Sequence, residues 1–471
     1  MMEKKKFRLF DAVLMAVVVV LVVESVAPAA AIGPSQFFWW AALLILFFLP
    51  YGLISAELGT TYDDDGGIYD WVRKAFGKRW GGRAAWLYWI NFPIWMASLA
   101  VLFTGVIEQT LQIKMGTWTN VLVQLVFIGV ITLICCYPIA DSKWILNLAA
   151  IAKIVIILSL GILGIYVAVT KGVASKFTVE TMLPKFDLKS LSYISVILFN
   201  FLGFEVVTTM ASDMQNPKKQ IPQAIVFGGI LIAFFYVFAA FGMGVAIPAS
   251  KLSASGGLMD SMLLLVGHHN WFIFLIAILF MYTLAANLIS WSAGVNYVAS
   301  YAAKNNDLPA IFGKLSQKND MPVGATVLNG VIAAVLVVAA PLIPNPDLFW
   351  AFFSLNVVAL LGSYILMFPA FWKLRKDDPN TERPFKVPGN KLMINLMTWI
   401  PVTLLIITLI FTAIPLNGSA SEINGKGPIL IGSIITVIVG EICIAHAEKK
   451  DKKSDPKPKI KSNIVESKGV N

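Results

Sequence analysis

The sequence predicts an all-α integral membrane protein with twelve transmembrane helices. Of its 471 residues, 58% are hydrophobic and only 14% are charged. Apolar runs of about 20 residues, the length that crosses the hydrocarbon core of a bilayer, recur along the whole chain. Lys and Arg gather in every second connection between these runs, as they do in chains that cross a membrane repeatedly. A soluble chain would instead alternate apolar and polar faces within each helix.

The first predicted span follows a basic stretch, as a signal peptide would. It is long and leads directly into a second span, so we expect it to be a retained helix. The twelve predicted spans are 9–32, 37–58, 84–110, 118–139, 144–170, 190–211, 224–247, 271–300, 324–343, 347–370, 392–415 and 428–447.

The loops predict the orientation of these spans. An even number of spans puts both termini on one side of the membrane, and the side that holds most Lys and Arg is the cytoplasmic one. With the N-terminus inside, the basic loops 72–83 and 373–391 are cytoplasmic. We therefore expect a multi-pass protein of the cell (plasma) membrane with both termini in the cytoplasm. The net charge of +10 is then a property of the loops, and no nucleic-acid partner is expected.

Two spans are interrupted, the first and the sixth. Five helices separate them, which favours a five-plus-five inverted repeat over about 9–170 and 190–370, followed by extra helices over about 392–447. We expect residues 1–447 to form one twelve-helix domain. Residues 448–471 are polar and rich in Lys, which predicts a basic, disordered cytoplasmic tail.

The first interruption lies in "VVESVAPAAAIGPS", residues 22–35. Glu24 is near the middle of the span, where an ionisable side chain is costly and usually functional. Pro28 has no N–H to donate to the carbonyl of Glu24. The carboxylate and this open carbonyl would together suit a cation. The alternative is a structural Glu24 that pairs with Lys153 or with a tyrosine.

The second interruption is "NFLGFE", residues 200–205, with Asn200, Gly203 and Glu205 in an apolar run. The glycine allows a substrate to approach the backbone closely. Glu205 could bind an ammonium group or a proton, or it could bridge the broken ends of the helix. The sequence does not decide between these two roles.

Lys153 is the basic residue placed deepest in a predicted span. It lies roughly 14 Å of helical rise from the nearest loop, which argues against a side chain that reaches the interface. Two roles fit a buried lysine here: it carries a coupling proton, or it occupies the place of a coupling cation.

The connection after the second span predicts a cytoplasmic gate segment. Acidic residues 63–65 precede Gly66 and Gly67, and a short amphipathic helix follows them. The two glycines would serve close packing or hinging. Aromatic side chains could also line a cavity for an organic cation, and the candidates are Trp86, Trp89, Trp95, Tyr282, Trp291 and Tyr364.

Other chemistries find no support in the sequence. The three cysteines and three histidines have no metal-ligand spacing, so we expect no metal and no cofactor. No nucleophile, base and acid are arranged as in an enzyme, and the loops are too short for a catalytic domain. We therefore expect a protein that is not an enzyme.

Three ordered motifs resemble the amino acid, polyamine and organocation (APC) transporters. They are "ELGTTYDDDGGIYDWVRKAFG", "NFLGFEVVTTMASDMQNPKKQIPQAI" and "AAKNNDLPAIFGKLSQKNDMPVGA". Lys153 falls where many members carry a lysine, and the resemblance covers residues 7–447. It implies the LeuT-type fold, with a small amine or amino acid bound between the breaks of helices 1 and 6 and carried across the bilayer by alternating access.

The resemblance also implies site residues. By position, Asn200, Gly203 and Glu205 match the helix 6 binding turn, and Glu24 and Ser25 fall near the helix 1 turn. Members that bind amino acids commonly have a run of small residues there, whose backbone amides hold the α-carboxylate. This chain has "VESVAP" instead, which favours an amine without a carboxylate.

The chain also resembles the bacterial antiporters of the glutamate/GABA-antiporter branch, which exchange a precursor for its amine product. Because Glu24 and Glu205 could each address one cationic end, we expect exchange of agmatine for putrescine. Exchange of tyrosine for tyramine or of another amino acid, and proton-coupled amino acid import with Lys153 as the proton carrier, remain alternatives. The sequence leaves open whether the chain forms a homodimer.

Overall fold

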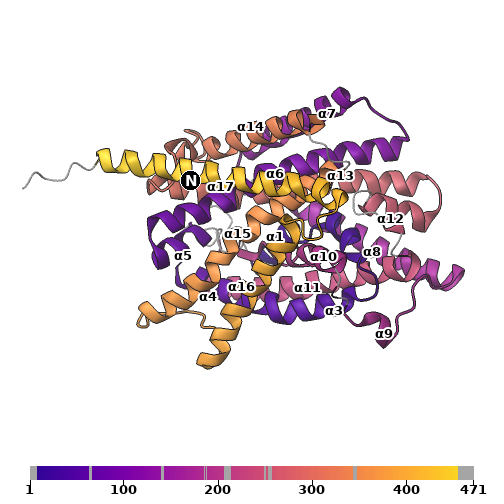
Figure 1. Cartoon of the computed structure of the whole chain (residues 1–471), viewed down its shortest axis with the longest axis horizontal. Coiled ribbons are helices and arrows are strands. Elements are labelled where there is room, and N and C mark those ends of the chain that lie inside the picture. The colour runs from indigo at the N-terminus through magenta and orange to yellow at the C-terminus, as the bar shows by residue number, and fades with distance from the viewer. Residues whose placement is uncertain are drawn as a thin grey trace, which may run out of the picture.

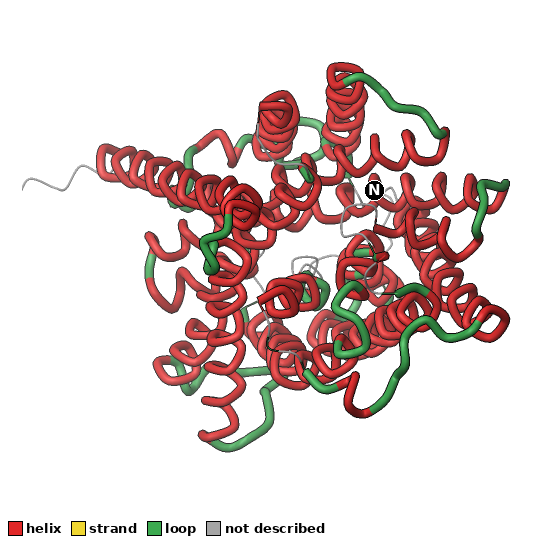
Figure 2. The backbone as a smooth tube through the Cα atoms, turned by 45° about the vertical axis from the view of Figure 1, so that its right-hand side comes forward, coloured by secondary structure: helices red, strands yellow, loops and turns green. Residues whose placement is uncertain are grey.

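The structure is a computed structural model. It describes residues 8–62, 66–138, 143–184, 186, 188–205, 214–248, 251–252, 257–342 and 347–454. The described residues form helices joined by loops (Figure 2), which confirms the all-α prediction. The acidic turn at 63–65, residues 206–213 of the helix 6 motif and residues 455–471 of the predicted tail lie outside this part of the chain.

Ten helices of the described residues are long and apolar enough to cross a membrane. The first predicted span is present as an interrupted helix, and the sixth is present up to its break within the described residues, so the twelve-span fold is confirmed. The ten long helices are the composite helix α3–α4 (Gln36–Thr61), α6 (Lys78–Leu111), α7 (Thr117–Cys135), α8 (Lys143–Lys171), α11 (Pro217–Ala246), α13 (Trp271–Lys304), α14 (Val323–Ala339), α15 (Leu348–Asp377), α16 (Lys391–Ala413) and α17 (Ala420–Ser454).

Both predicted interruptions are present. The first span consists of α1 (Leu9–Val20), a 3-10 turn η1 (Val23–Ser25) and a short α2 (Val26–Ala30). The sixth begins as α10 (Leu188–Phe199), and the chain then leaves the helix through Gly203, which has a φ of 107°. We call residues 21–25 the first break and residues 200–205 the second break.

Several helices are longer than the apolar runs that predicted them. α6 begins at Lys78 rather than at 84, and α15 continues to Asp377 rather than ending at 370. α17 continues to Ser454, past residue 447. Helical hydrogen bonds continue through polar residues outside the hydrocarbon, so an apolar run marks only the part of a helix that lies within it.

A π-helical segment, Leu44–Phe48, divides α3 (Gln36–Leu43) from α4 (Leu49–Thr61) and was not predicted. Pro50 follows it and has no N–H to donate to the carbonyl of Leu46. Loss of this bond is a local cause of the wider turn, and such bulges are frequent at functional sites.

Among the described residues, four shorter helical pieces lie apart from the spans, and the 3-10 turn η7 (Ala340–Leu342) continues α14. The amphipathic helix predicted after Gly66 is present as α5 (Gly67–Phe76). The other three, α9 (Val179–Met182), α12 (Gly257–Val266) and the 3-10 turn η6 (Ala310–Gly313), were not predicted. α12 matters for the site because it packs against η1, in the first break, and against α2, which directly follows the break.

The two broken helices lie within the bundle of spans. α6 and α15 are the most buried spans and pack against each other, and α13 packs against α6. α1 contacts α8 and α11, while α10 contacts α2. Figure 1 shows α5 at one end of the molecule and α12 and α9 at the opposite end. The breaks are therefore enclosed between scaffold helices and are capped at one end by α12.

Candidate substrate site

A tyrosine from α11 supports the first break. The Tyr236 hydroxyl accepts a hydrogen bond from the Val22 N–H at 2.7 Å and donates one to the Val20 carbonyl at 2.9 Å. Its ring stacks on Trp40 of α3, with centroids 5.0 Å apart. Unwinding a helix removes the partners of its backbone groups, and Tyr236 replaces two of them.

Lys153 of α8 holds the end of α1. Its Nζ donates to the carbonyl of Leu21 at 2.6 Å, and its side chain is fully buried. The ammonium thus meets the negative end of the α1 dipole. It also interacts electrostatically with Glu24. The predicted deep position of Lys153 is confirmed, and its partner is a carbonyl that the break exposes.

Glu24 lies in η1 and is 3% exposed. Its Oε1 has no hydrogen-bond partner among the described residues. The N-terminus of α12 approaches the same turn, since a Cβ added to Gly257 would lie 3.8 Å from the Glu24 carbonyl oxygen. A buried carboxylate oxygen without a partner is costly, so this position is suited to a cationic ligand.

The two breaks are joined by Ser25 and Asn200. The Ser25 hydroxyl lies within hydrogen-bond distance of the Asn200 Oδ1 and also, at 2.7 Å, of the Val22 carbonyl. Asn200 is completely buried, and its Nδ2 has no partner among the described residues. The structure therefore brings together Glu24, Ser25 and Asn200, three of the residues predicted to bind substrate.

Glu205 is held by tyrosines from two other helices. The hydroxyls of Tyr51 on α4 and of Tyr88 on α6 donate to its two carboxylate oxygens, the latter at 2.7 Å. The Tyr51 hydroxyl also accepts from the Gly203 N–H at 3.1 Å. These contacts correspond to the structural role considered for Glu205, in which the carboxylate stabilises the second break.

Aromatic rings surround the second break. Tyr364 of α15 meets Tyr51 edge-on, with centroids 5.5 Å apart. Trp95 of α6 packs against Phe199, the residue before Asn200, at 5.6 Å. Of the aromatic residues proposed from the sequence, Trp95 and Tyr364 thus lie next to this break. Trp86 lies elsewhere, in a groove on the outside of the bundle.

Both predicted gate positions, Gly66 and Gly67, accept only glycine without strain. A Cβ at Gly66 would lie 2.8 Å from the ring of Tyr301 on α13, and Gly67 has a φ of 47°. The helix that they begin is fastened by Asp307, which accepts from Tyr69 at 2.7 Å and from Arg73 at 2.6 Å. Burial raises the pKa of the Tyr69 phenol and the bond to Asp307 raises it further, so the hydroxyl remains a donor.

A second charged cluster closes the same end of the bundle. Glu57, at the end of α4, binds Arg375 of α15 through two hydrogen bonds of 2.7 and 2.5 Å. It also forms an ion pair with Arg383 at 3.2 Å and accepts the Val387 N–H at 2.6 Å. We call this cluster the Glu57 latch. It joins α4 to α15 and to the loop that precedes α16.

Comparison with known proteins decides the family. A sequence model described as amino acid permease matches residues 7–440. The chain belongs to the amino acid permease family. This membership confirms the predicted APC superfamily and identifies the permease as a multi-pass membrane protein of a transporter family.

Three curated relatives show where the permease lies within this family. It is 55% identical to "Probable agmatine/putrescine antiporter AguD" of Lactococcus lactis, over 94% of this chain and 95% of that one. It is 24% identical to "Glutamate/gamma-aminobutyrate antiporter" of the same species, over 78% and 76%. It is also 24% identical to "Polyamine transporter RMV1" of Arabidopsis thaliana, over 85% and 77%.

Sequence reasoning missed the tyrosines of the permease site, Tyr51, Tyr88 and Tyr236. Each lies in an apolar span and supports a break that is distant along the chain. Their sequence context offers one indication, which is that Tyr51 directly follows Pro50 in the middle of a span. Within the described residues, no group of three or more His, Cys, Asp or Glu could hold a metal ion.

Proposed function

We propose that the permease exchanges agmatine for putrescine across the cell membrane, with both termini in the cytoplasm. The 55% identity to the lactococcal protein over almost the full length of both chains supports this substrate pair. The distribution of Lys and Arg supports the orientation. The site geometry adds an independent reason to prefer amines over amino acids.

The observation that carries the proposal is the unpaired oxygen of Glu24 in the first break. Amino acid recognition at such a break needs free backbone amides for the α-carboxylate. Here the Val22 N–H is bound by Tyr236, and the Ser25 N–H donates to the Val22 carbonyl at 3.2 Å. An amine would gain the Glu24 carboxylate, whereas an α-carboxylate would be repelled by it.

Asn200 supplies a second contact for an amine. The single proton of the Ser25 hydroxyl has two acceptors within reach, the Val22 carbonyl and the Asn200 Oδ1. Rotating the Asn200 amide by half a turn removes this conflict, because its Nδ2 then donates to Ser25. Its carbonyl oxygen would then face away from Ser25 and could accept from a substrate ammonium group.

The remaining predicted site residues have supporting roles in this proposal. Lys153 occupies the place of a coupling cation at the end of α1, and Glu205 and Gly203 fix the second break close to the substrate. Gly66 and Gly67 belong to the cytoplasmic gate. The first, second, sixth and seventh spans (α1–α2, α3–α4, α10 and α11) form a bundle. It rocks against the third, fourth, eighth and ninth spans (α6, α7, α13 and α14) and exposes the breaks to each side in turn.

Counterflow in proteoliposomes tests the exchange. Vesicles that contain the purified chain and putrescine should accumulate labelled agmatine, and vesicles without an internal amine should not. Glu24→Gln should abolish this uptake because it removes the charge that the substrate needs. Glu108→Gln, near the end of α6 and outside both breaks, is the matched control and should leave uptake unchanged.

The same assay separates the alternative substrates. Tyramine or tyrosine loaded in place of putrescine should drive no agmatine uptake. Equal uptake into empty and loaded vesicles would exclude strict exchange, and uptake that requires an acidic exterior would favour proton-coupled import. Unchanged agmatine affinity in Glu24→Gln would remove Glu24 from the site.

A further inference from the structure

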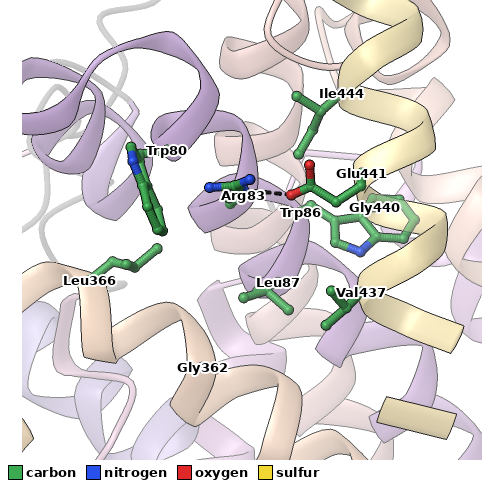
Figure 3. A pocket seen from close by; sticks show the side chains of 10 residues that line it. All are labelled: Trp80, Arg83, Trp86, Leu87, Gly362, Leu366, Val437, Gly440, Glu441 and Ile444. Atoms are coloured by element: carbon green, nitrogen blue, oxygen red, sulfur yellow. Dashed lines mark hydrogen bonds and ion pairs between the residues drawn. The ribbon is translucent and has the colours of Figure 1, made fainter. Parts of the chain in front are cut away.

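A groove lies on the outside of the bundle, between α6, α15 and α17. None of the residues that line it belongs to either break. Its volume is about 570 Å³. Figure 3 shows its walls, with Trp80 and Leu366 on one side and Trp86 and Val437 on the other. Gly440 helps to shape it, because any side chain there would collide with the Trp86 ring.

The groove has a charged edge and an apolar wall. The Arg83 guanidinium lies 4.4 Å from the ring centroid of Trp80 and donates through Nε to Glu441 at 2.5 Å. Arg79 binds the other oxygen of Glu441 at 3.0 Å. Two guanidinium groups therefore share the Glu441 carboxylate, and Glu448 also interacts electrostatically with Arg79. Residues 78–83 and 441–450, which form this edge, hold five Lys and Arg against two Glu, so the edge has a net positive charge. A guanidinium has five N–H donors, so these bonds do not exhaust either arginine.

The groove opens to the surroundings of the bundle. Trp80 is 44% exposed and Val437 is 53% exposed, although both belong to spans. The charged edge lies in the first turns of α6, which directly follow α5 in the chain and pack against it. In a membrane, this places the arginines near the headgroups of one leaflet and the apolar wall beside its acyl chains.

We propose that this groove binds an anionic phospholipid of that leaflet. The phosphate would contact Arg83 and Arg79, and an acyl chain would lie against Trp86, Leu366 and Val437. Basic pockets between transmembrane helices are suited to such headgroups. A second copy of the chain fits less well, because a two-fold interface sets one patch against itself and would bring two positive edges together.

Native mass spectrometry of the delipidated full chain tests this proposal. Phosphatidylglycerol and phosphatidylcholine with identical acyl chains are the probes. We expect phosphatidylglycerol to bind about fivefold more tightly, the effect of one basic side chain at a membrane surface. Arg79→Gln, Arg83→Gln and Glu441→Gln together remove both guanidinium groups and the carboxylate that they share, so this triple variant should abolish the preference without leaving an unpaired carboxylate. The control is Lys318→Gln, which replaces an exposed lysine at the same end of the bundle and should leave the preference unchanged.

A second variant tests the apolar wall independently of charge. Leu366→Trp fills the groove and should weaken binding of both lipids, whereas Leu122→Trp, on the exposed face of α7, should not. Equal binding of the two lipids by the unchanged chain would overturn the proposal. So would a dimer that Leu366→Trp dissociates, because the groove would then be an interface between two copies.

Discussion

Tyr51, Tyr88 and Tyr236 each place one hydroxyl at a helix break where backbone or carboxylate groups need a partner. Tyr236 is the clearest case because it both accepts from and donates to the first break. Backbone groups at bilayer depth have no water to replace such a partner. Tyrosine hydroxyls therefore make an unwound helix stable within an apolar bundle.

Replacing Tyr236 with Phe tests this role. Tyr236→Phe removes two hydrogen bonds and leaves the Val22 N–H without that partner, so the free energy of unfolding should fall by about 1–3 kcal/mol. Unfolding of the purified chain by sodium dodecyl sulfate measures this change. Tyr166→Phe, at a side chain that is 64% exposed, should unfold as the unchanged chain does. Identical unfolding of the two variants would show that Tyr236 does not support the break.

The sequence identified the polar residues of the breaks but not their partners. Glu24, Asn200 and Lys153 are conspicuous because each is polar within an apolar run. Tyr236 is not, since a tyrosine in a span is usually a packing or interface residue. Its contact with Val22 joins residues 214 positions apart, and no local spacing encodes such a pair.

At the scale of the elements, the Glu57 latch joins α4 to α15. Its carboxylate is buried and accepts both ends of the Arg375 guanidinium. Charge-assisted, bidentate pairs of this kind are strong and specific in geometry. Because α15 packs against α6 of the scaffold, we infer that the latch must open when α4 moves away from the scaffold in the proposed rocking motion.

Arg375→Gln should therefore loosen this end of the bundle. Ser55, buried on α4 beside Met367 of α15, offers a reporter in the form of Ser55→Cys in a background without the native cysteines. We expect its labelling by a thiol reagent to accelerate on the order of tenfold when Arg375→Gln is added, since a charged hydrogen bond contributes about 1.5–3 kcal/mol. Lys373→Gln, which breaks an exposed ion pair on the same helix, should leave the rate unchanged. Equal rates in the two backgrounds would contradict the latch.

The elements that sequence reasoning missed are those that hydropathy cannot distinguish. α12 is apolar, but its ten residues are too few to cross a bilayer, so its position over the first break depends on tertiary contacts. The π-helical segment lies within an apolar run that is continuous in the sequence. The two breaks could be predicted because glycine and polar residues interrupt their runs.

In the molecule as a whole, the two ends of the bundle are formed by different structural elements. α5 lies toward one end, and α12 and α9 lie at the other (Figure 1). The Glu57 latch is near the C-terminal ends of α4 and α15, and α15 packs against both α4 and α5. The arginines of the outer groove are in the first turns of α6, directly after α5. The proposed orientation places the first end in the cytoplasm because of its Lys and Arg.

Single cysteines in a background without the native cysteines test this orientation. Lys318→Cys, between η6 and α14, should react with a membrane-impermeant thiol reagent in inside-out vesicles but not in intact cells. Val179→Cys, 84% exposed on α9, should react in intact cells. The reverse pattern would invert the topology, and reaction of both sites from one side would contradict the number of spans between them.

The bond between Lys153 and the Leu21 carbonyl has a consequence for the electrical balance of transport. Where a free ion fills such a position, it can enter on one side and leave on the other, and its charge then counts in the turnover. Here the cation is part of the chain. In the role that we propose for Lys153, any charge that the side chain carries across the membrane field returns with it, so over a complete cycle only the two cargoes would contribute. Agmatine and putrescine each carry two positive charges at neutral pH, because their amine and guanidine groups are strong bases. Their one-for-one exchange by this permease would move no net charge and would run at the same equilibrium whatever the membrane potential.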